Sequence, residues 1–169
     1  PILRGGDNVD GFLVSPNLCE RYCLPEYEKE AAFLHAKGKL MAVHMDGRMK
    51  SLKELVARSP VDIVEALHPP PMGDLPIGEA LAAWPDKAVW VGFPASEYTL
   101  GADAVRTHAL ELLRDVAPGD RLAIAMSSEN LVSNENLLAL TSVLEHAELP
   151  LSEAAVDEIE RAITKGAVR

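Results

Sequence analysis

A histidine and an aspartate stand two positions apart where an apolar stretch of the sequence ends. The segment 39–45 is mostly apolar and contains His44, and Asp46 and Gly47 follow it directly. This pattern is typical of a buried parallel strand that ends in polar residues. A histidine next to a carboxylate can hold a metal, transfer a proton or bind a polar substrate. It can equally hydrogen-bond its own loop, and the stretch alone favours that simpler role.

A carboxylate lies inside the next apolar stretch. Glu65 interrupts the run 61–67, and an unpaired carboxylate is costly to bury in a strand. This favours a role for Glu65 in a site, although an ion pair across the sheet would satisfy it as well. His68 follows and precedes three prolines, which predicts a non-helical loop. We expect His68 to be either a loop residue or a further member of the site.

Strands and helices alternate along the chain. Complete strands are predicted to begin near residues 39, 62, 87 and 120, and a helix follows each of them. Such alternation is typical of an α/β domain with a parallel sheet. The nucleotide-binding motif GxGxxG and the nucleophile elbow GxSxG are absent. The predicted strands are 1–4, 39–45, 61–67, 87–93 and 121–126, and the predicted helices are 17–22, 26–37, 51–58, 77–84, 102–116, 136–148 and 152–164.

Polar residues gather after the predicted strands. In parallel α/β folds the carboxyl ends of the strands meet at one edge, where sites form. Residues of these types also serve turns and helix caps, so both roles stay open for those in loops. The candidates expected to lie together are Asp7, Asp10, His44, Asp46, Glu65, His68, Ser96, Glu129 and Asn130.

The composition predicts a folded protein that does not bind nucleic acid or anionic membranes. The 169 residues are 48% hydrophobic and 25% charged, which suits one domain with a core. The formal net charge of −10 argues against nucleic acid and anionic membranes as partners. No apolar run approaches the ~20 residues of a membrane helix, and no signal-peptide pattern is present. We therefore expect a cytoplasmic protein.

Two cysteines are four positions apart on a predicted helix. Cys19 and Cys23 would share one face, as a metal half-site or a redox pair would require. In a chain with this composition, simple packing is the expected role. Trp84 and Trp90 are likewise expected in the core.

Several short motifs, in order, resemble the second half of the uroporphyrinogen decarboxylase superfamily. They are Ser15-Pro16 before a helix, His35-Ala-Lys-Gly38, the strand end His44-x-Asp46-Gly47, the turn Pro94 to Glu97 and Asn136-Leu-Leu-Ala-Leu. The resemblance covers most of residues 1–150 and implies the C-terminal half of a (β/α)8 TIM barrel. The superfamily includes the porphyrinogen decarboxylase of haem biosynthesis and corrinoid-dependent methyltransferases.

The chain departs from both branches of that superfamily. In the methyltransferases the strand end reads His-x-Cys-Gly, and a second cysteine after the last strand completes a zinc site. Here Asp46 replaces the first cysteine, and Ser127 and Ser128 stand after the last strand. The same serines replace the Gly-His pair of the decarboxylases. The resemblance then implies an oxygen-rich zinc or manganese site of His44, Asp46 and Glu65.

The resemblance implies a corrinoid-linked methyltransferase that acts on a small methylated substrate. His44 and Glu65 would be catalytic, and a partner protein would carry the corrinoid or cobalamin. The substrate-binding residues would be Asp7, Asp10, Ser96, Ser128 and Glu129. The alternatives are a porphyrinogen decarboxylase and a non-catalytic ligand-binding barrel. Because a full barrel needs ~250 residues, we expect 1–169 to be one partial domain, a C-terminal fragment that forms homodimers through its open edges.

Overall fold

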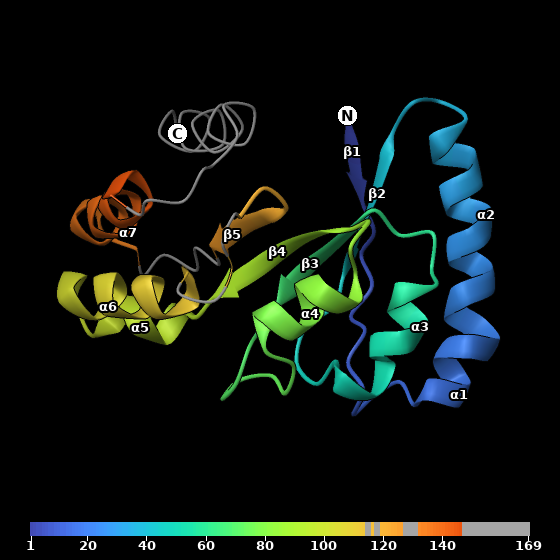
Figure 1. Ribbon diagram of the computed structural model, residues 1–169, viewed down its shortest axis with the longest axis horizontal. Coiled ribbons are helices and arrows are strands. Elements are labelled where there is room, and N and C mark those ends of the chain that lie inside the picture. The colour runs from blue at the N-terminus through green and yellow to red at the C-terminus, as the bar shows by residue number, and fades with distance from the viewer. Residues whose placement is uncertain (114–115, 117–118, 127–131, 147–169) are drawn as a thin grey trace. The chain divides into compact units, whose positions relative to one another are not determined.

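The computed structural model describes residues 1–113, 116, 119–126 and 132–146 (Figure 1). The chain divides into two compact units, Pro1–Phe93 and the part that begins at Pro94. The predicted helix 152–164 and the candidates Ser127, Ser128, Glu129 and Asn130 lie outside the described residues. The sequence predicted that residues 1–169 form one partial domain. Whether the two units join into one domain stays a prediction.

The first unit contains four strands, each separated from the next by helices. Its strands are β1 (Ile2–Arg4), β2 (Leu40–His44), β3 (Ile63–Leu67) and β4 (Ala88–Phe93). Its helices are α1 (Pro16–Leu18), the π turn η1 (Cys19–Cys23), α2 (Leu24–His35), the 3-10 turn η2 (Lys50–Leu52), α3 (Lys53–Ala57) and α4 (Ile77–Ala83).

The described part of the second unit contains one strand and three helices. They are α5 (Ala95–Thr99), α6 (Ala102–Leu113), β5 (Leu122–Met126) and α7 (Asn134–His146). The segment 94–97, predicted as a turn, instead enters the short helix α5. Inside this unit the Asn136 side chain donates to the Tyr98 carbonyl at 2.9 Å and ties α7 to α5.

The strands β1 to β4 pair in parallel and lie in the order of the sequence. The prediction of an α/β fold with parallel strands alternating with helices is therefore confirmed. Sequential order is the order of neighbouring strands in a (β/α) barrel, so the sheet is consistent with part of such a barrel. In the part of the chain that the structure describes, we find no helix that could span a membrane.

The start of the first helix follows the local sequence signals. The Ser15 side chain caps the helix by accepting from the Leu18 N–H, and Pro16 occupies the first turn. The predicted break before Pro25 is absent, because the chain widens into the π turn η1 and continues directly into α2. Since proline can neither donate to the preceding turn nor fit closely against it, the wider turn lets the helix pass Pro25.

The two faces of the sheet differ in burial. Side chains alternate between the faces along each strand, and paired residues of neighbouring strands point to the same face. One face is almost fully buried, and α2 packs alongside β2 (Figure 1). The buried face carries Met41, Val43, Val64, Val89 and Val91, and the opposite face carries Arg4, His44, Glu65 and Trp90. In a barrel this second face lines the interior.

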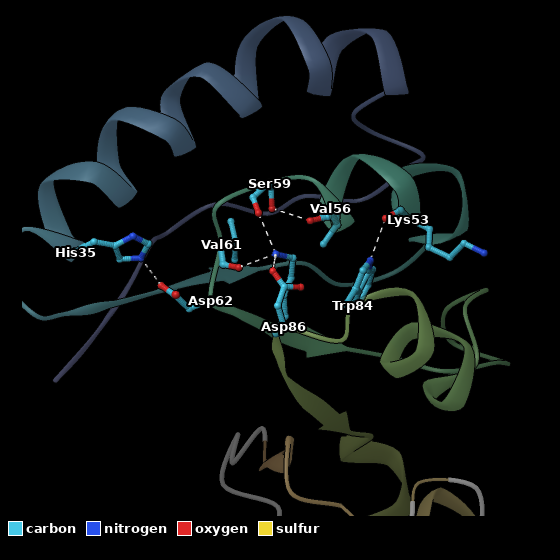
Figure 2. Close-up of polar contacts among 9 residues, drawn as sticks. His35, Lys53, Val56, Ser59, Val61, Asp62, Trp84 and Asp86 are labelled. Atoms are coloured by element: carbon cyan, nitrogen blue, oxygen red, sulfur yellow. Dashed lines mark hydrogen bonds and ion pairs between the residues drawn. The ribbon is translucent and has the colours of Figure 1, made fainter.

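The amino ends of the strands are held by polar side chains that bond to backbone carbonyls (Figure 2). Lys87 is only 1% exposed, and its Nζ donates to the carbonyls of Ser59 at 2.9 Å and Val61 at 3.1 Å. Trp84, which was predicted in the core, is fully buried and donates from Nε1 to the Lys53 carbonyl. These donors satisfy carbonyls that burial would otherwise leave unpaired.

A histidine and a carboxylate also meet at this end of the sheet. Asp62 Oδ2 lies 2.8 Å from His35 Nε2 (Figure 2). The same oxygen accepts from the Met41 N–H at 2.7 Å. The carboxylate thereby ties the end of α2 and the start of β2 to the start of β3.

Candidate functional site

His44 and Glu65 come together because β2 and β3 pair in register. The two residues are direct partners across the parallel pair, so their side chains leave the sheet on the same face. His44 Nδ1 lies 2.5 Å from Glu65 Oε2. Glu65 is 12% exposed and His44 is 24% exposed, which limits access of water to their contact.

The contact with Glu65 determines how the imidazole of His44 is used. A carboxylate accepts hydrogen bonds and donates none, so the Nδ1 atom carries the proton in this pair. In the neutral imidazole the Nε2 atom then presents its lone pair. His44 Nε2 faces Asp46, at 3.7 Å from the Oδ2 atom. The arrangement is a chain of carboxylate, imidazole and carboxylate.

Arg4 adds a cation to this group from the edge strand β1. Its Nε donates to Glu65 Oε2 at 2.9 Å, and its Nη2 lies 3.1 Å from His44 Nδ1. Half of the Arg4 side chain is exposed, at 51%. Arg4 was not among the site residues predicted from the sequence. Its alternation with Ile2 could have placed it on one face of a strand, but only the register with β2 brings it beside His44.

Trp90 is the apolar neighbour of this group. It pairs with Glu65 across β3 and β4 and therefore lies on the same face. Trp90 was predicted in the core, but the structure leaves it half-buried. An indole beside a polar group offers an apolar contact surface to a ligand.

The predicted metal ligands are arranged in two sets. Among the residues that the structure describes, no group of three or more histidine, cysteine, aspartate or glutamate side chains could hold a metal ion. His44 Nε2 and Asp46 Oδ2 face each other, whereas Glu65 contacts the other nitrogen of the ring. Glu65 is thus placed to orient His44 rather than to share a ligand position with it.

Asp10 serves the loops beside the site. Its Oδ1 accepts from the backbone N–H groups of Phe12 at 2.8 Å and Arg48 at 3.0 Å. Its carboxylate also packs against Gly47, where a Cβ atom would lie 2.6 Å from Oδ2. The Asp10 side chain thus helps to join the loops that follow β1 and β2, as expected of an aspartate in a turn.

The remaining predicted substrate-binding residues do not join this group within the described residues. Asp7 lies near Tyr27 of α2: burial first, and then the charge of Asp7, raise the pKa of the Tyr27 hydroxyl. Ser96 is exposed in the second unit, and its carbonyl accepts from the Thr99 hydroxyl. Ser128 and Glu129 fall outside the described residues.

His68 lies at the end of β3, and its ring lies against Gly92 of β4. A Cβ atom on Gly92 would lie 2.3 Å from His68 Nε2, so only glycine leaves room for the ring. The His68 carbonyl is similarly close to Gly73, where a Cβ atom would lie 1.8 Å away. The loop that carries His68 is therefore packed tightly against its neighbours.

The two cysteines fit a packing role. Both are free thiols; Cys19 is buried and Cys23 is half-buried. Burial, followed by the neighbouring Cys23, raises the pKa of Cys19 to about 11. Burial also raises the pKa of Cys23. Because the thiolate is the reactive and metal-binding form, these pKa values disfavour a redox or metal site at neutral pH.

Comparison with known proteins adds no family assignment. No protein-family model, no curated protein and no solved structure matches this chain.

Proposed function

We propose that the protein is a barrel enzyme of the uroporphyrinogen decarboxylase superfamily, most similar to its corrinoid-linked methyltransferases, that transfers a methyl group with the help of a metal ion. The observation that carries the proposal is the orientation of His44. Glu65 holds the Nδ1 atom at 2.5 Å, and Nε2 is left facing Asp46. A carboxylate behind a histidine is the usual support of a metal-binding imidazole.

The donor atoms suit zinc or manganese. Imidazole nitrogen and carboxylate oxygen both bind these ions, with bond lengths of about 2.0–2.2 Å. The 3.7 Å between His44 Nε2 and Asp46 Oδ2 is shorter than two such bonds, so one ion can contact both atoms. When bound, the ion would supply Lewis-acid activation of the methyl-bearing group.

Each residue of the group has a separate role in this proposal. His44 and Asp46 hold the ion, and Glu65 fixes the orientation of the ring. Arg4 holds Glu65 in place through the 2.9 Å ion pair. Trp90 contacts the methyl group of a small substrate. The corrinoid that exchanges the methyl group would be carried by a partner protein.

The charge of the group distinguishes this proposal from porphyrinogen decarboxylation. With a neutral His44, the single positive charge of Arg4 faces the two negative charges of Glu65 and Asp46. Excess negative charge attracts a cation and repels a substrate with many carboxylates. The alternative function, porphyrinogen decarboxylation, would have only Arg4 in this group to bind the substrate carboxylates. Porphyrinogen turnover by the purified protein tests this alternative.

Self-association and cytoplasmic location belong to the same proposal. In the first unit β1 is an edge strand, and Leu3 is exposed on it. Unpaired strand edges favour association. We therefore expect homodimers, which light scattering on the purified protein would detect.

Titration calorimetry with zinc chloride tests the proposed metal site. The chelator-treated protein should bind one zinc ion, and His44→Ala should abolish binding. Asp46→Asn should weaken binding, and Glu65→Gln should weaken it ~10–100-fold because the supporting carboxylate is lost. His35→Ala is the matched control, since His35 also contacts a carboxylate but lies at the other end of the sheet.

Two results would contradict the proposal. One is the absence of zinc and manganese binding by the unaltered chain. The other is unchanged zinc binding by His44→Ala.

A further inference from the structure

The geometry points to a second histidine in this site: we propose that His68 is a substrate-binding residue whose ring hydrogen-bonds the protic heteroatom of a small methylated substrate. This inference rests on the proposed function for the choice of substrate class. Its structural basis is independent, because it uses the end of β3 rather than the contacts of His44.

An irregularity in β3 changes which face His68 occupies. Simple alternation would place His68 on the opposite face from Glu65, three positions earlier. Instead, Glu65 pairs with Trp90 and Leu67 pairs with Val91, so Ala66 is an extra residue in the strand. Ala66 has a φ of +65°, which is rare for a residue with a side chain. The extra residue moves His68 to the face of Glu65 and Trp90.

Gly92 provides direct evidence for this placement. The missing Cβ of Gly92 would point to the same face as Trp90, because the two residues are two positions apart in β4. The His68 ring occupies that position, with Nε2 at 2.3 Å and Cε1 at 2.4 Å from the Cβ site. The ring therefore lies on the face of the sheet that carries His44 and Glu65.

The His68 ring remains available for a ligand. Within the described chain, no hydrogen bond or ion pair to a side-chain atom of His68 is found, and the residue is only half-buried. In contrast, His44 and His35 each contact a carboxylate. An imidazole can donate from one nitrogen and accept at the other, which suits a hydroxyl, amine or thiol.

Strain beside a site supports a functional placement. A positive φ at a non-glycine residue is unfavourable, and strand bulges often re-aim a side chain next to an active site. Ala66 turns His68 toward the face that carries His44 and Glu65. Gly92 leaves room there for the His68 ring.

Nuclear magnetic resonance of the histidine rings tests the proposal on the full chain. The probes are methanol, methylammonium chloride and methanethiol, added separately with and without zinc. We expect at least one probe to shift the His68 Cε1–H resonance in a saturable manner. The His35 resonance should not move, because His35 lies at the opposite end of the sheet.

Gly92→Ala is the decisive variant, because the added methyl group displaces the His68 ring without removing it. Gly92→Ala should weaken the binding of the probe, measured by the shift of the His68 Cε1–H resonance, at least tenfold. Gly6→Ala is the matched control, since a Cβ on Gly6 meets nothing within 4 Å. His68→Ala removes the ring without adding atoms and provides a second test if Gly92→Ala does not fold. It should weaken the effect of the probe on the His44 resonance to a similar degree.

The proposal is overturned if no probe moves the His68 resonance, or if Gly92→Ala responds as Gly6→Ala does. Zinc binding is read separately from the His44 resonance. A His68 response without a zinc response would support the role of His68 and contradict the proposed metal chemistry. A zinc response without a His68 response would support the proposed metal site and contradict the role of His68.

Discussion

The two ends of the same parallel sheet use similar side chains for different purposes. At the amino end, His35 contacts Asp62, and the Asp62 carboxylate also accepts a backbone N–H. At the carboxyl end, His44 contacts Glu65, but the next polar partner is another side chain, Asp46. Both ends therefore carry a histidine–carboxylate pair, and only one pair is tied into the backbone.

The two ends differ in what their polar side chains bond to. Polar side chains that satisfy buried backbone groups hold a fold together, and their loss exposes unpaired groups. Polar side chains that contact only other side chains, or that have no polar contact, are available to a ligand. In (β/α) barrels the amino end of the strands is associated with stability and the carboxyl end with catalysis. In this sheet the polar side chains at the amino end bond to the backbone, and those of the His44 group bond to one another.

The largest effect on stability is expected at the amino end, from Lys87→Met. The substitution removes the donor to the Ser59 and Val61 carbonyls inside the protein. Two buried acceptors left unpaired should lower the free energy of unfolding by about 3 kcal/mol. Urea denaturation followed by circular dichroism measures the change. Lys29→Met, at an exposed ion pair with Glu26, should have a much smaller effect; equal losses would contradict the division between the ends.

A matched pair of aspartates compares the two ends directly. Asp62→Ala should lower the free energy of unfolding by about 2 kcal/mol, because the carboxylate accepts from Met41 N–H and contacts His35. Asp46→Ala should change it by less than about 0.5 kcal/mol, since its partner His44 is 3.7 Å away at a partly exposed position. Urea unfolding of both variants checks the comparison, and a larger loss for Asp46→Ala would reverse the assignment of the ends.

The smallest effect concerns strain at the carboxyl end. Ala42→Gly should cost about 1 kcal/mol, because glycine in a strand loses more conformational freedom on folding. Ala66→Gly should cost close to nothing, since glycine relieves the positive φ of Ala66. Both alanines are buried in neighbouring strands, which makes the pair a fair comparison by thermal or urea unfolding. Equal losses would show that Ala66 is not strained.

Local features of the fold were predictable from the sequence. Ser15 and Pro16 predicted a helix start, and the apolar runs predicted the parallel strands to within one or two residues. Such features depend on neighbours along the chain. The break at Pro25 was predicted wrongly, because the π turn that accommodates the proline has no clear sequence signal.

The candidate site was predictable only in part. His44, Asp46 and Glu65 were selected from the ends and interiors of apolar runs, and the structure brings these three together. Arg4 was missed because its partner lies 61 positions away. Lys87 was also missed, since nothing in the sequence distinguishes a buried lysine at the start of a strand from an exposed one.

The sequence by itself determined that strands alternate with helices and that His44 stands at a strand end with a carboxylate two positions later. The tertiary structure decided which atoms of that histidine are occupied, because the register of β2 with β3 places Glu65 against Nδ1. It also decided on which face His68 lies. One extra residue in a strand reverses the alternation of every side chain that follows, and that residue is identified by its pairing with the neighbouring strand.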